Sequence, residues 1–449
     1  MKSSVQTKDI RPVTRIETDV LVVGAGAAGV AAAVTAARQG LKVTVVERYG
    51  FCGGGAVAGL SGTVCGLYEA SEDADARPRQ VVFGFADEFI RLMERKGGLT
   101  APVRYGKTYT RVHDPLVWRE AGDHLLRQAG VRVLFHTTVT DVLLEGGERI
   151  AGVMAYTKQG KLDIRAKLTI DASGDADVVA MAGLETFMGQ DGQVQNPTMI
   201  FRLQGVDVGR FLTTYGPDSI MGESVSSTIQ KLNQEKTYRL PRAKIFLFPT
   251  PRPHELLCNA TRIIGRDGRE LNPVCVEDIT EAEIEGRLQV REYARFIKAH
   301  ITGCEESFVN DTGVQVGVRQ TRQIRAVTTL SNENVVGKAK SRTGIARCPW
   351  PIEMHSGEKP RLVWLFNDYY EVPYECFVPV QGESLLVAGR CLSAQHEAMA
   401  SARVTAQCFG YGHAIGHAAA ISLHEGVAPR AVDGAALRER LNRDGARLD

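Results

Sequence analysis

Short apolar runs separated by polar and glycine-containing segments recur along the chain, and the first run is the most regular. Residues 20–23 (Val-Leu-Val-Val) form a continuous apolar stretch of the kind that is buried in a parallel sheet. The alanine-rich segment after it extends to about Gln39, and Gly40 can cap the C-terminus of a helix there. Residues 41–46 have the pattern of a second strand. The beginning of the chain therefore predicts a strand–helix–strand unit.

Helix and strand patterns follow one another again in the next part of the chain. Asp114 and Pro115 suit the N-cap and the first position of a helix, which is expected to continue to about Gln128. Four apolar stretches come after it, separated mainly by glycine-containing turns. They predict a meander of strands over residues 131–135, 138–144, 149–157 and 161–170.

Near the C-terminus, residues 383–388 predict a strand, and a long helix rich in small residues is expected from about Ser401 to His424, before Gly426. Its glycines are too widely spaced for a phosphate-binding turn and no strand precedes them, so they are expected to mark close helix packing: Gly410, Gly412 and Gly416. A further helix is expected over about residues 280–300.

The turn after the first strand carries candidate chemistry, because it reads Gly24-Ala25-Gly26-Ala27-Ala28-Gly29. In this pattern the first glycine permits the tight turn, Gly26 lets the backbone approach a pyrophosphate, and Gly29 lets the helix lie close to the sheet. Glu47 ends the second strand 23 residues after Gly24, where an acid can accept hydrogen bonds from a ribose. This register predicts a dinucleotide site; the alternative is a close-packed turn without a ligand.

A second glycine cluster follows Glu47 directly, at Gly50 and residues 53–55. It would let more backbone approach an extended cofactor, whereas an NAD(P) domain more often continues into another helix. The cluster therefore favours FAD. Cys52 and Cys65 are separated by twelve residues, so they are expected to be ordinary thiols rather than a redox pair.

Composition narrows the classes of partner. The chain has 449 residues, of which 44% are hydrophobic and 24% charged, as in a globular protein of two domains. A net charge of +2 gives no basic field, so neither nucleic acid nor a membrane surface is expected as a partner. No apolar run approaches the roughly 20 residues that span a bilayer, and a cytoplasmic location is expected. The nine cysteines form no C-x-x-C pair, so no metal site is expected.

Four blocks together resemble the FAD-dependent oxidoreductases of the glutathione-reductase-like superfamily, with relatives among fumarate-reductase and heterodisulfide-reductase flavoproteins. They are the turn from Gly24 to Glu47, DPLVWREAGDHLLRQAGVRVLFHTTVTDVL, IDASGDADVVAMAG, and SLLVAGRCLSAQHEAMASARVTAQCFGYGHAIGHAAA. The resemblance implies an α/β fold: a Rossmann-like FAD-binding domain with three-layer ββα topology, interrupted by an α+β substrate domain.

The expected domains follow from these blocks. A flexible N-terminal extension is expected over residues 1–17. The FAD-binding domain is discontinuous, and it comprises residues 18–75, 113–199 and 376–449. The substrate or cap domain comprises residues 76–112 and 200–375.

The resemblance also implies roles for single residues at the cofactor. Val139 would contact adenine through its backbone, Asp175 would hold the ribityl or phosphate region, and Gly389 with Arg390 would border the pyrophosphate. The expected FAD-binding residues are Gly24, Gly26, Ala27, Ala28, Gly29, Glu47, Arg48, Gly53, Gly54, Val139, Ser173, Gly174, Asp175, Gly389 and Arg390.

Four residues are candidates for the chemistry on the substrate side. Arg319 and Arg322, three residues apart on an expected helical face, would bind a carboxylate or another anion, or else form salt bridges. His396 would act as an acid or base beside flavin N5; the alternative is a packed, hydrogen-bonded histidine. Arg403, expected to begin the last helix, would hold substrate or flavin, or cap local carbonyl groups.

The expected reaction is hydride transfer between a small organic substrate and flavin N5, as substrate oxidation with O2 or an external acceptor reoxidising the flavin. Three alternatives stay open: a partner-fed reductase of an activated double bond, a flavin monooxygenase, and a non-catalytic redox-sensing flavoprotein. Non-covalent FAD is expected, with Cys391 as the alternative attachment point. The oligomeric state stays open, and a homo-oligomer is compatible with the sequence.

Overall fold

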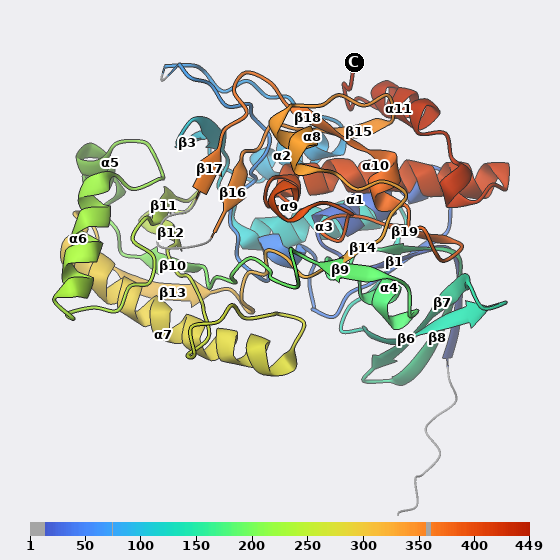
Figure 1. Ribbon diagram of the computed structural model, residues 1–449, viewed down its shortest axis with the longest axis horizontal. Coiled ribbons are helices and arrows are strands. Elements are labelled where there is room, and N and C mark those ends of the chain that lie inside the picture. The colour runs from blue at the N-terminus through green and yellow to red at the C-terminus, as the bar shows by residue number, and fades with distance from the viewer. Residues whose placement is uncertain (1–13, 74, 356–360) are drawn as a thin grey trace, which may run out of the picture.

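The computed structural model describes residues 14–73, 75–355 and 361–449. Residues 1–13 of the expected N-terminal extension lie outside the described residues, and residues 14–17 of that range already belong to the first strand, β1 (Thr14–Val23). Figure 1 shows the sheet that contains β1 at one end of the molecule and a smaller, mainly helical region at the other.

The main sheet has seven strands in the order β5 (Arg132–Leu134), β2 (Val43–Val46), β1, β8 (Gly160–Asp171), β7 (Arg149–Thr157) and β6 (Thr138–Glu145), with β19 (Leu385–Val387) also paired to β8. Strands β5, β2, β1, β8 and β19 run parallel, whereas β8, β7 and β6 are antiparallel. The long β8 pairs with β7 through its first half and with β19 through its last three residues. This arrangement confirms the predicted α/β, Rossmann-like class.

One part of the predicted meander is wrong. The strand expected over residues 131–135 is β5, and it pairs in parallel with β2 at the far edge of the sheet. Only β6, β7 and β8 form the meander. The physical reason is that helix α3 (Pro115–Gln128), which begins at the predicted Asp114 cap, is a crossover that returns the chain parallel to β2.

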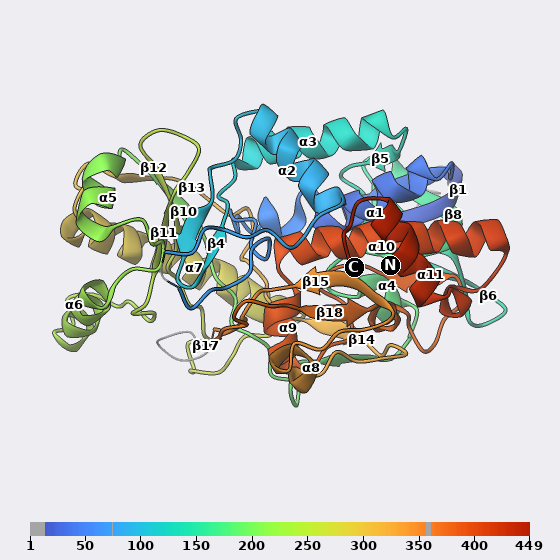
Figure 2. The same ribbon diagram turned by 90° about the horizontal axis from the view of Figure 1, so that it is seen from above.

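Two helices lie against the sheet, and their backbones come close to each other. Helix α1 (Ala27–Arg38) packs along α10 (Thr405–Glu425), and the two run side by side in Figures 1 and 2. A Cβ on Gly412 would lie 2.1 Å from the carbonyl oxygen of Ala28, and one on Gly416 would lie 2.6 Å from that of Ala32. The predicted packing role of these glycines is confirmed. Helix α2 (Phe85–Arg95) packs against both α10 and α3.

The last predicted helix is two helices. Helix α9 (His396–Ala402) ends at Arg403, and α10 begins after its N-cap Val404. The expectation that Arg403 begins the final helix is therefore wrong. No proline or glycine marks the break, so local sequence did not show it. The predicted end of the helix is confirmed, since Gly426 caps α10 in the left-handed conformation with φ of 68°.

A second apolar core lies in the smaller region. Its antiparallel sheet has the order β11 (Phe246–Pro249), β12 (Glu255–Asn259), β10 (Phe201–Gln204) and β13 (Phe308–Thr312). Helices α5 (Val208–Tyr215), α6 (Glu223–Gln234) and α7 (Val276–His300) belong to this region (Figure 1). Helix α7 begins at Val276, four residues earlier than predicted. The buried residues of this core fall between Met199 and Val316.

The first core also takes side chains from residues 81–112 and 324–374, which the predicted domain division assigns to the substrate part. The exact division therefore stays a prediction. The remaining short strands form four pairs: β3 (Val103–Tyr105) with β4 (Thr108–Thr110), β14 (Arg322–Ile324) with β9 (Thr186–Met188), β15 (Gly344–Cys348) with β18 (Tyr370–Pro373), and β16 (Ile352–Met354) with β17 (Arg361–Val363).

The remaining helices are short ones and the C-terminal helix. They are α4 (Asp177–Met181), α8 (Asn332–Val336) and α11 (Gly434–Arg443). Among the helices of the described ranges, none combines the length and apolarity that crossing a membrane requires.

Candidate cofactor and substrate site

A cavity of about 450 Å³ lies at the carboxyl ends of the parallel strands and continues to the second core. Segments from all the blocks that predicted a dinucleotide site line it. Of the expected FAD-binding residues, those that line the cavity are Gly24, Gly26, Ala27, Ala28, Glu47, Arg48, Gly53, Gly54, Val139, Ser173, Gly174, Asp175, Gly389 and Arg390. Gly29 is the exception, because it faces the turn rather than the cavity.

The three glycines of the turn have different physical roles. Gly24 has φ of +100°, and a Cβ there would lie 2.5 Å from the carbonyl oxygen of Ala172. A Cβ on Gly29 would lie 1.9 Å from the carbonyl oxygen of Gly24. A Cβ on Gly26 would meet only the Cα of Gly54, at 3.8 Å. Gly24 and Gly29 are therefore required by the fold, whereas Gly26 keeps open a space on the cavity side.

Helix α1 presents its N-terminus to this space. Its N-cap is Gly26, and no side chain of the described residues accepts a hydrogen bond from its first N–H groups. Uncapped N–H groups and the positive end of the helix dipole attract phosphate. Together with the open face of Gly26, they form a cradle that fits the pyrophosphate of a dinucleotide.

Glu47 is held at the edge of the cradle by backbone groups. Its Oε2 accepts a hydrogen bond from the N–H of Ala25 at 2.8 Å, and its Oε1 accepts one from the N–H of Tyr49 at 2.9 Å. These bonds fix the carboxylate but use only part of its accepting capacity. Lone pairs therefore remain for the hydroxyl groups of a ribose, as the sequence predicts.

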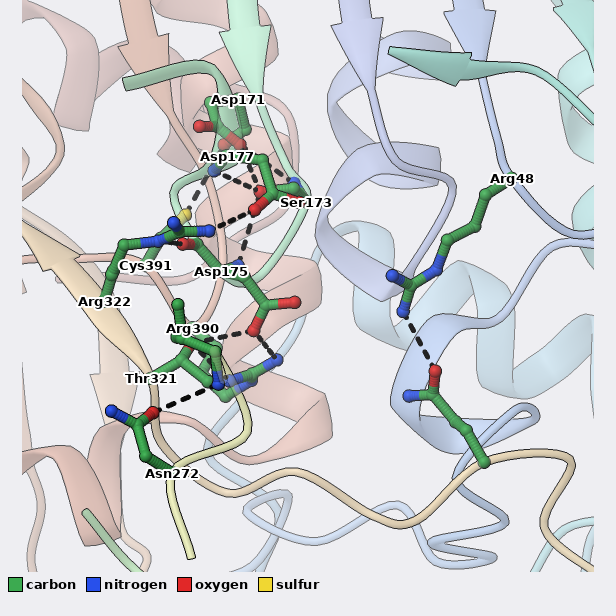
Figure 3. A network of polar contacts seen from close by, with 12 residues as sticks. Arg48, Asp171, Ser173, Asp175, Asp177, Asn272, Thr321, Arg322, Arg390 and Cys391 are labelled. Carbon is green, nitrogen blue, oxygen red and sulfur yellow. Dashed lines mark hydrogen bonds and ion pairs between the residues drawn. The ribbon is translucent and has the colours of Figure 1, made fainter. Parts of the chain in front are cut away.

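Asp175 is tied to two distant segments. Its Oδ1 accepts hydrogen bonds from Thr321 Oγ1 at 2.7 Å and from Arg390 Nη2 at 2.8 Å (Figure 3). Burial raises the pKa of the Asp175 carboxyl, but the charge of Arg390 and these hydrogen bonds outweigh burial, so the net pKa is lowered. Asp175 is therefore an anion at neutral pH, and Arg390 compensates its charge.

Asp171 shapes the loop that carries Asp175. It is fully buried, and its Oδ1 accepts hydrogen bonds from the N–H of Ser173 at 3.0 Å and from Ser173 Oγ at 2.6 Å. Its Oδ2 accepts one from the N–H of Val178 at 2.9 Å, at the start of α4. These bonds, shown in part in Figure 3, hold Ser173 and Gly174 against the cavity.

Arg322 and His396 are not among the residues that line the cavity. Arg322 begins strand β14 rather than lying on a helix, so the expected helical face shared with Arg319 is wrong. Its guanidinium pairs with Asp177 and donates from Nε to the carbonyl oxygen of Asp175 at 2.9 Å (Figure 3). His396 is the first residue of α9, and its Nδ1 is buried without a hydrogen-bond partner among the described residues.

Arg319 and Arg403 do line the cavity. Nη1 of Arg319 donates to the carbonyl oxygen of Asn196 at 2.7 Å, and Nη2 of Arg403 donates to Oε1 of Gln195 at 3.2 Å. Nε of Arg403 is buried and has no partner among the residues that the structure describes. The buried guanidinium of Arg319 and the half-buried guanidinium of Arg403 therefore have donors to spare at one end of the cavity.

A carboxylate and an imidazole that the sequence analysis missed lie at the same end. Glu353 and His355 are buried and line the cavity, and His355 Nε2 lies 3.2 Å from Glu353 Oε1. Glu353 also accepts a hydrogen bond from the hydroxyl of Tyr105 at 2.6 Å and one from Nε1 of Trp350 at 3.3 Å. The sequence signal was that Glu353, within the otherwise apolar β16, and His355, the residue directly after that strand, are two positions apart.

Charge and burial set the protonation of these groups. Burial raises the pKa of Glu353, but the adjacent His355 and Arg403 and the hydroxyl of Tyr105 outweigh it, and the net pKa is lowered. Burial and the charge of Arg319 lower the pKa of His355 to about 3. Burial and the charges of Arg403 and Arg242 lower the pKa of Arg319 well below its ordinary range. At neutral pH the cluster therefore holds an ionised Glu353 beside a neutral His355.

The cysteines show no redox pairing. All nine are free. Cys65 lines the cavity, and burial raises the pKa of its thiol to about 12, whereas Cys52 is buried and not in the lining. Cys391 is also absent from the lining, and its Sγ faces the carbonyl oxygens of Asp171 and Ala388 at 3.5 and 3.6 Å. This position favours non-covalent binding of a cofactor.

The sequence model of the family described as FAD dependent oxidoreductase matches residues 19–441, nearly the whole chain. The chain belongs to this family. The protein is thus an FAD-dependent oxidoreductase, and its cofactor is FAD. The cradle at Gly26 and the fixed carboxylate of Glu47 fit a cofactor of this kind.

Two curated relatives are similar in sequence to part of this chain. Thiamine thiazole synthase from Sulfolobus acidocaldarius is 31% identical over 183 residues, which are 37% of this chain and 59% of the synthase. The protein of the same description from Metallosphaera sedula is 29% identical over 180 residues, or 36% of this chain and 57% of the relative. The chain thus spans less than two thirds of the length of these relatives.

Solved structures are similar over most of the chain at low identity. A geranylgeranyl bacteriochlorophyll reductase-like protein from Thermoplasma acidophilum has a TM-score of 0.49 and 15% identity, covering 96% of this chain and 83% of that one. The p-nitrophenol 4-monooxygenase from Pseudomonas putida has a TM-score of 0.49 and 13% identity, covering 93% of this chain and 83% of that one.

Proposed function

We propose that this FAD-dependent oxidoreductase oxidises a small organic anion by hydride transfer to FAD, with O2 or an external acceptor restoring the oxidised cofactor. The observation that carries the proposal is the group of polar side chains at one end of the cavity: buried Arg319 and half-buried Arg403 with spare donors, beside ionised Glu353 and neutral His355. When bound, FAD supplies the hydride acceptor at N5.

The charge balance of this group favours an anionic substrate. Arg319, Arg403 and the neighbouring buried Arg242 carry three guanidinium groups, whereas Glu353 is the carboxylate that offsets them. Buried charge without compensation is costly, and a planar carboxylate can accept paired hydrogen bonds from a guanidinium. A substrate carboxylate at Arg319 and Arg403 would compensate the excess positive charge and fix the substrate in one orientation.

The walls around these charges exclude water from a bound substrate. Tyr105, Trp350 and Phe248 line the cavity and are almost fully buried. The rings of Tyr105 and Trp350 lie 5.1 Å apart, and those of Tyr105 and Phe248 lie 6.2 Å apart. A low-polarity wall strengthens the interaction between a guanidinium and a carboxylate. This wall suits binding of the anionic end next to an apolar part of the substrate.

His355 is the proton acceptor that we infer. An ionised carboxylate only accepts hydrogen bonds, so the Nε2 of His355 donates to Glu353 and Nδ1 is left as the basic nitrogen. In the absence of an anion, Arg319 holds the pKa of His355 low. A bound substrate carboxylate would offset the charge of Arg319 and raise that pKa, so the imidazole becomes a better base when substrate is present. A hydroxyl or amine proton of the substrate would pass to Nδ1.

The test is anaerobic bleaching of the protein-bound flavin by a panel of small hydroxy, amino and saturated carboxylic acids, followed by admission of air. Bleaching by one of them and recovery in air would support oxidation of an organic anion. For that compound, Arg319→Gln should raise KM about tenfold or more, because it removes a buried charge partner.

The exposed Arg325→Gln is the matched control and should leave KM unchanged, since Arg325 is exposed and lies outside the cavity lining. No bleaching by any acid, together with reduction of the flavin by a protein or nicotinamide donor, would overturn the proposal. That outcome would instead favour a reductase or a monooxygenase.

A further inference from the structure

Two histidines of α10 and one aspartate after α11 converge on a point outside the cavity. His413 and His417 are one helical turn apart, and Asp444 directly follows α11. The Oδ2 of Asp444 lies 2.8 Å from Nε2 of His413 and 2.9 Å from Nε2 of His417. One ligand atom from each residue lies within 4.8 Å of the other two. None of the three residues lines the cavity.

The neighbouring packing fixes the two imidazole rings. Gly412 and Gly416 hold α10 against α1, so His413 and His417, each the next residue along, share one adjacent face of the helix. Both rings are buried, and their centroids are 5.2 Å apart. A Cβ on Gly84 would lie 2.9 Å from Nδ1 of His413, so the chain of residue 84 also confines that ring. The rings are therefore positioned before any ligand arrives.

Asp444, the third residue of the cluster, leaves the cluster open to solvent on its side. The side chain of Asp444 is 56% exposed, so it can move slightly and solvent can reach the site. Figure 2 shows α11 packed beside α10, close to the C-terminus. Of the nearby cations, Arg38 is paired with Glu88 at 2.7 Å, whereas Arg440 donates a hydrogen bond to the neutral amide of Gln39 and keeps its charge.

This donor set matches a transition-metal ion. Two imidazole nitrogens and one carboxylate oxygen, with a remaining position for water, are a common ligand set for Zn²⁺ and its neighbours in the series. Bonds of about 2.0–2.2 Å to one ion require the ligand atoms to move apart slightly from hydrogen-bond distance. The exposed Asp444 provides that adjustment. Two imidazoles in the spacing H-x-x-x-H were visible in the sequence, where no metal site was expected.

We propose that His413, His417 and Asp444 bind a single divalent transition-metal ion, of which Zn²⁺ is the best match, and that the ion ties α11 to α10. The site is independent of the proposed substrate oxidation. It would stabilise the C-terminal part of the fold, because an ion that binds the folded chain and not the unfolded one shifts the equilibrium toward the folded state.

The experiment uses the FAD-loaded full chain without a histidine tag, stripped with a chelator and titrated calorimetrically with Zn²⁺. One equivalent should bind, and the thermal midpoint should rise by about 2 °C or more over the chelator-treated protein. His417→Gln and Asp444→Asn should each weaken binding about tenfold or more and remove the midpoint shift. His424→Gln, an exposed histidine of the same helix, should leave both unchanged.

The variants distinguish a metal site from a set of hydrogen bonds that merely joins Asp444 to His413 and His417. Asp444→Asn retains an oxygen that can accept a hydrogen bond from one imidazole, but it is a much poorer metal ligand than a carboxylate. Absence of Zn²⁺ binding in the wild-type chain would overturn the proposal. Equal Zn²⁺ affinity in the wild type, His417→Gln and Asp444→Asn would also overturn it.

Discussion

Oδ1 of Asp175 and Nη2 of Arg390 lie 2.8 Å apart, although 215 positions separate the two residues in the chain. Asp175 follows the end of β8, and Arg390 comes after β19, the strand that pairs with the last residues of β8. Parallel pairing brings both carboxyl ends to the same edge of the sheet. The ion pair thus closes one wall of the FAD cavity with segments from the middle and the end of the chain.

We expect Arg390→Gln to weaken FAD binding. The change leaves the Asp175 carboxylate with Thr321 as its remaining side-chain partner, and an uncompensated anion at a phosphate-binding site repels the cofactor. The dissociation constant of FAD should rise about tenfold or more, which corresponds to about 1.4 kcal/mol. Reconstitution of stripped protein, followed by flavin fluorescence, measures it. Arg390→Lys retains the charge and should recover part of the affinity; equal affinity of the Gln variant and the wild type would contradict the prediction.

Gly26→Ala should leave the fold intact and impair FAD binding. A Cβ at position 26 meets only the Cα of Gly54 at 3.8 Å, so the protein itself accommodates the methyl group. The methyl group would occupy the space where the backbone can approach a pyrophosphate. The variant should purify with an unchanged thermal midpoint in its FAD-free form and with little bound flavin.

Gly24→Ala provides the contrast. Its φ of +100° and a Cβ 2.5 Å from the Ala172 carbonyl oxygen place the strain in the fold itself, at a cost of about 1–3 kcal/mol. The FAD-free protein should therefore unfold at a lower temperature. Gly222→Ala, where a Cβ meets nothing within 4 Å, should change neither property. If Gly26→Ala retained FAD as well as the wild type does, the inference that the pyrophosphate lies against the Gly26 backbone would be wrong.

The cradle was predictable from sequence because its geometry is local. The turn at residues 24–29, the end of β2 at Glu47 and the cap at Asp114 each depend on neighbours within a few residues. Glycine positions and caps report such geometry directly. Strand order is different, because β5 and β6 have similar local patterns and only the crossover through α3 sends them to opposite edges.

The charged end of the cavity could not be predicted in the same way. Tyr105, Arg319, Glu353 and Arg403 come from four separate segments that only tertiary packing brings together. Arg319 and Arg403 are candidates from the sequence, whereas Tyr105 and Glu353 are not. Only packing of the four beside one another changes their pKa values. Arg319 and Arg322 illustrate why sequence spacing is not enough. They are three positions apart, yet Arg319 lines the cavity and Arg322 pairs with Asp177.

The two histidines that compete for the role of proton acceptor give distinct expectations. His355→Gln should slow reduction of the flavin by substrate about 10²–10⁴-fold without loss of FAD, because Gln can donate to Glu353 but cannot accept a proton. His396→Ala should leave that rate close to the wild-type value, since His396 does not line the cavity. Stopped-flow absorbance under anaerobic conditions measures both rates. The reverse order would restore His396 as the acid or base and remove His355.

Acid should destabilise the fold through His113. Its ring packs against Trp118 with centroids 4.5 Å apart, and neither ring nitrogen has a hydrogen-bond partner among the described residues. Burial lowers the pKa of His113 from about 6.5 to about 4. Between these values the unfolded chain binds a proton that the folded chain does not, so the free energy of unfolding falls as pH decreases from about 6.5 to about 4. Below about pH 4 both states are protonated and this contribution stops changing.

His113→Gln removes the titrating group and should reduce that pH dependence, by at most about 1.4 kcal/mol for each pH unit in the window. Unfolding midpoints measured at several pH values between 4.5 and 7, the working range set by the two pKa values, compare the variant with the wild type. The glutamine is expected to lower stability at pH 7, so the slope and not the absolute midpoint carries the result. His424→Gln, at an exposed position, should keep the wild-type slope. An unchanged slope in His113→Gln would show that acid acts on the fold through other groups.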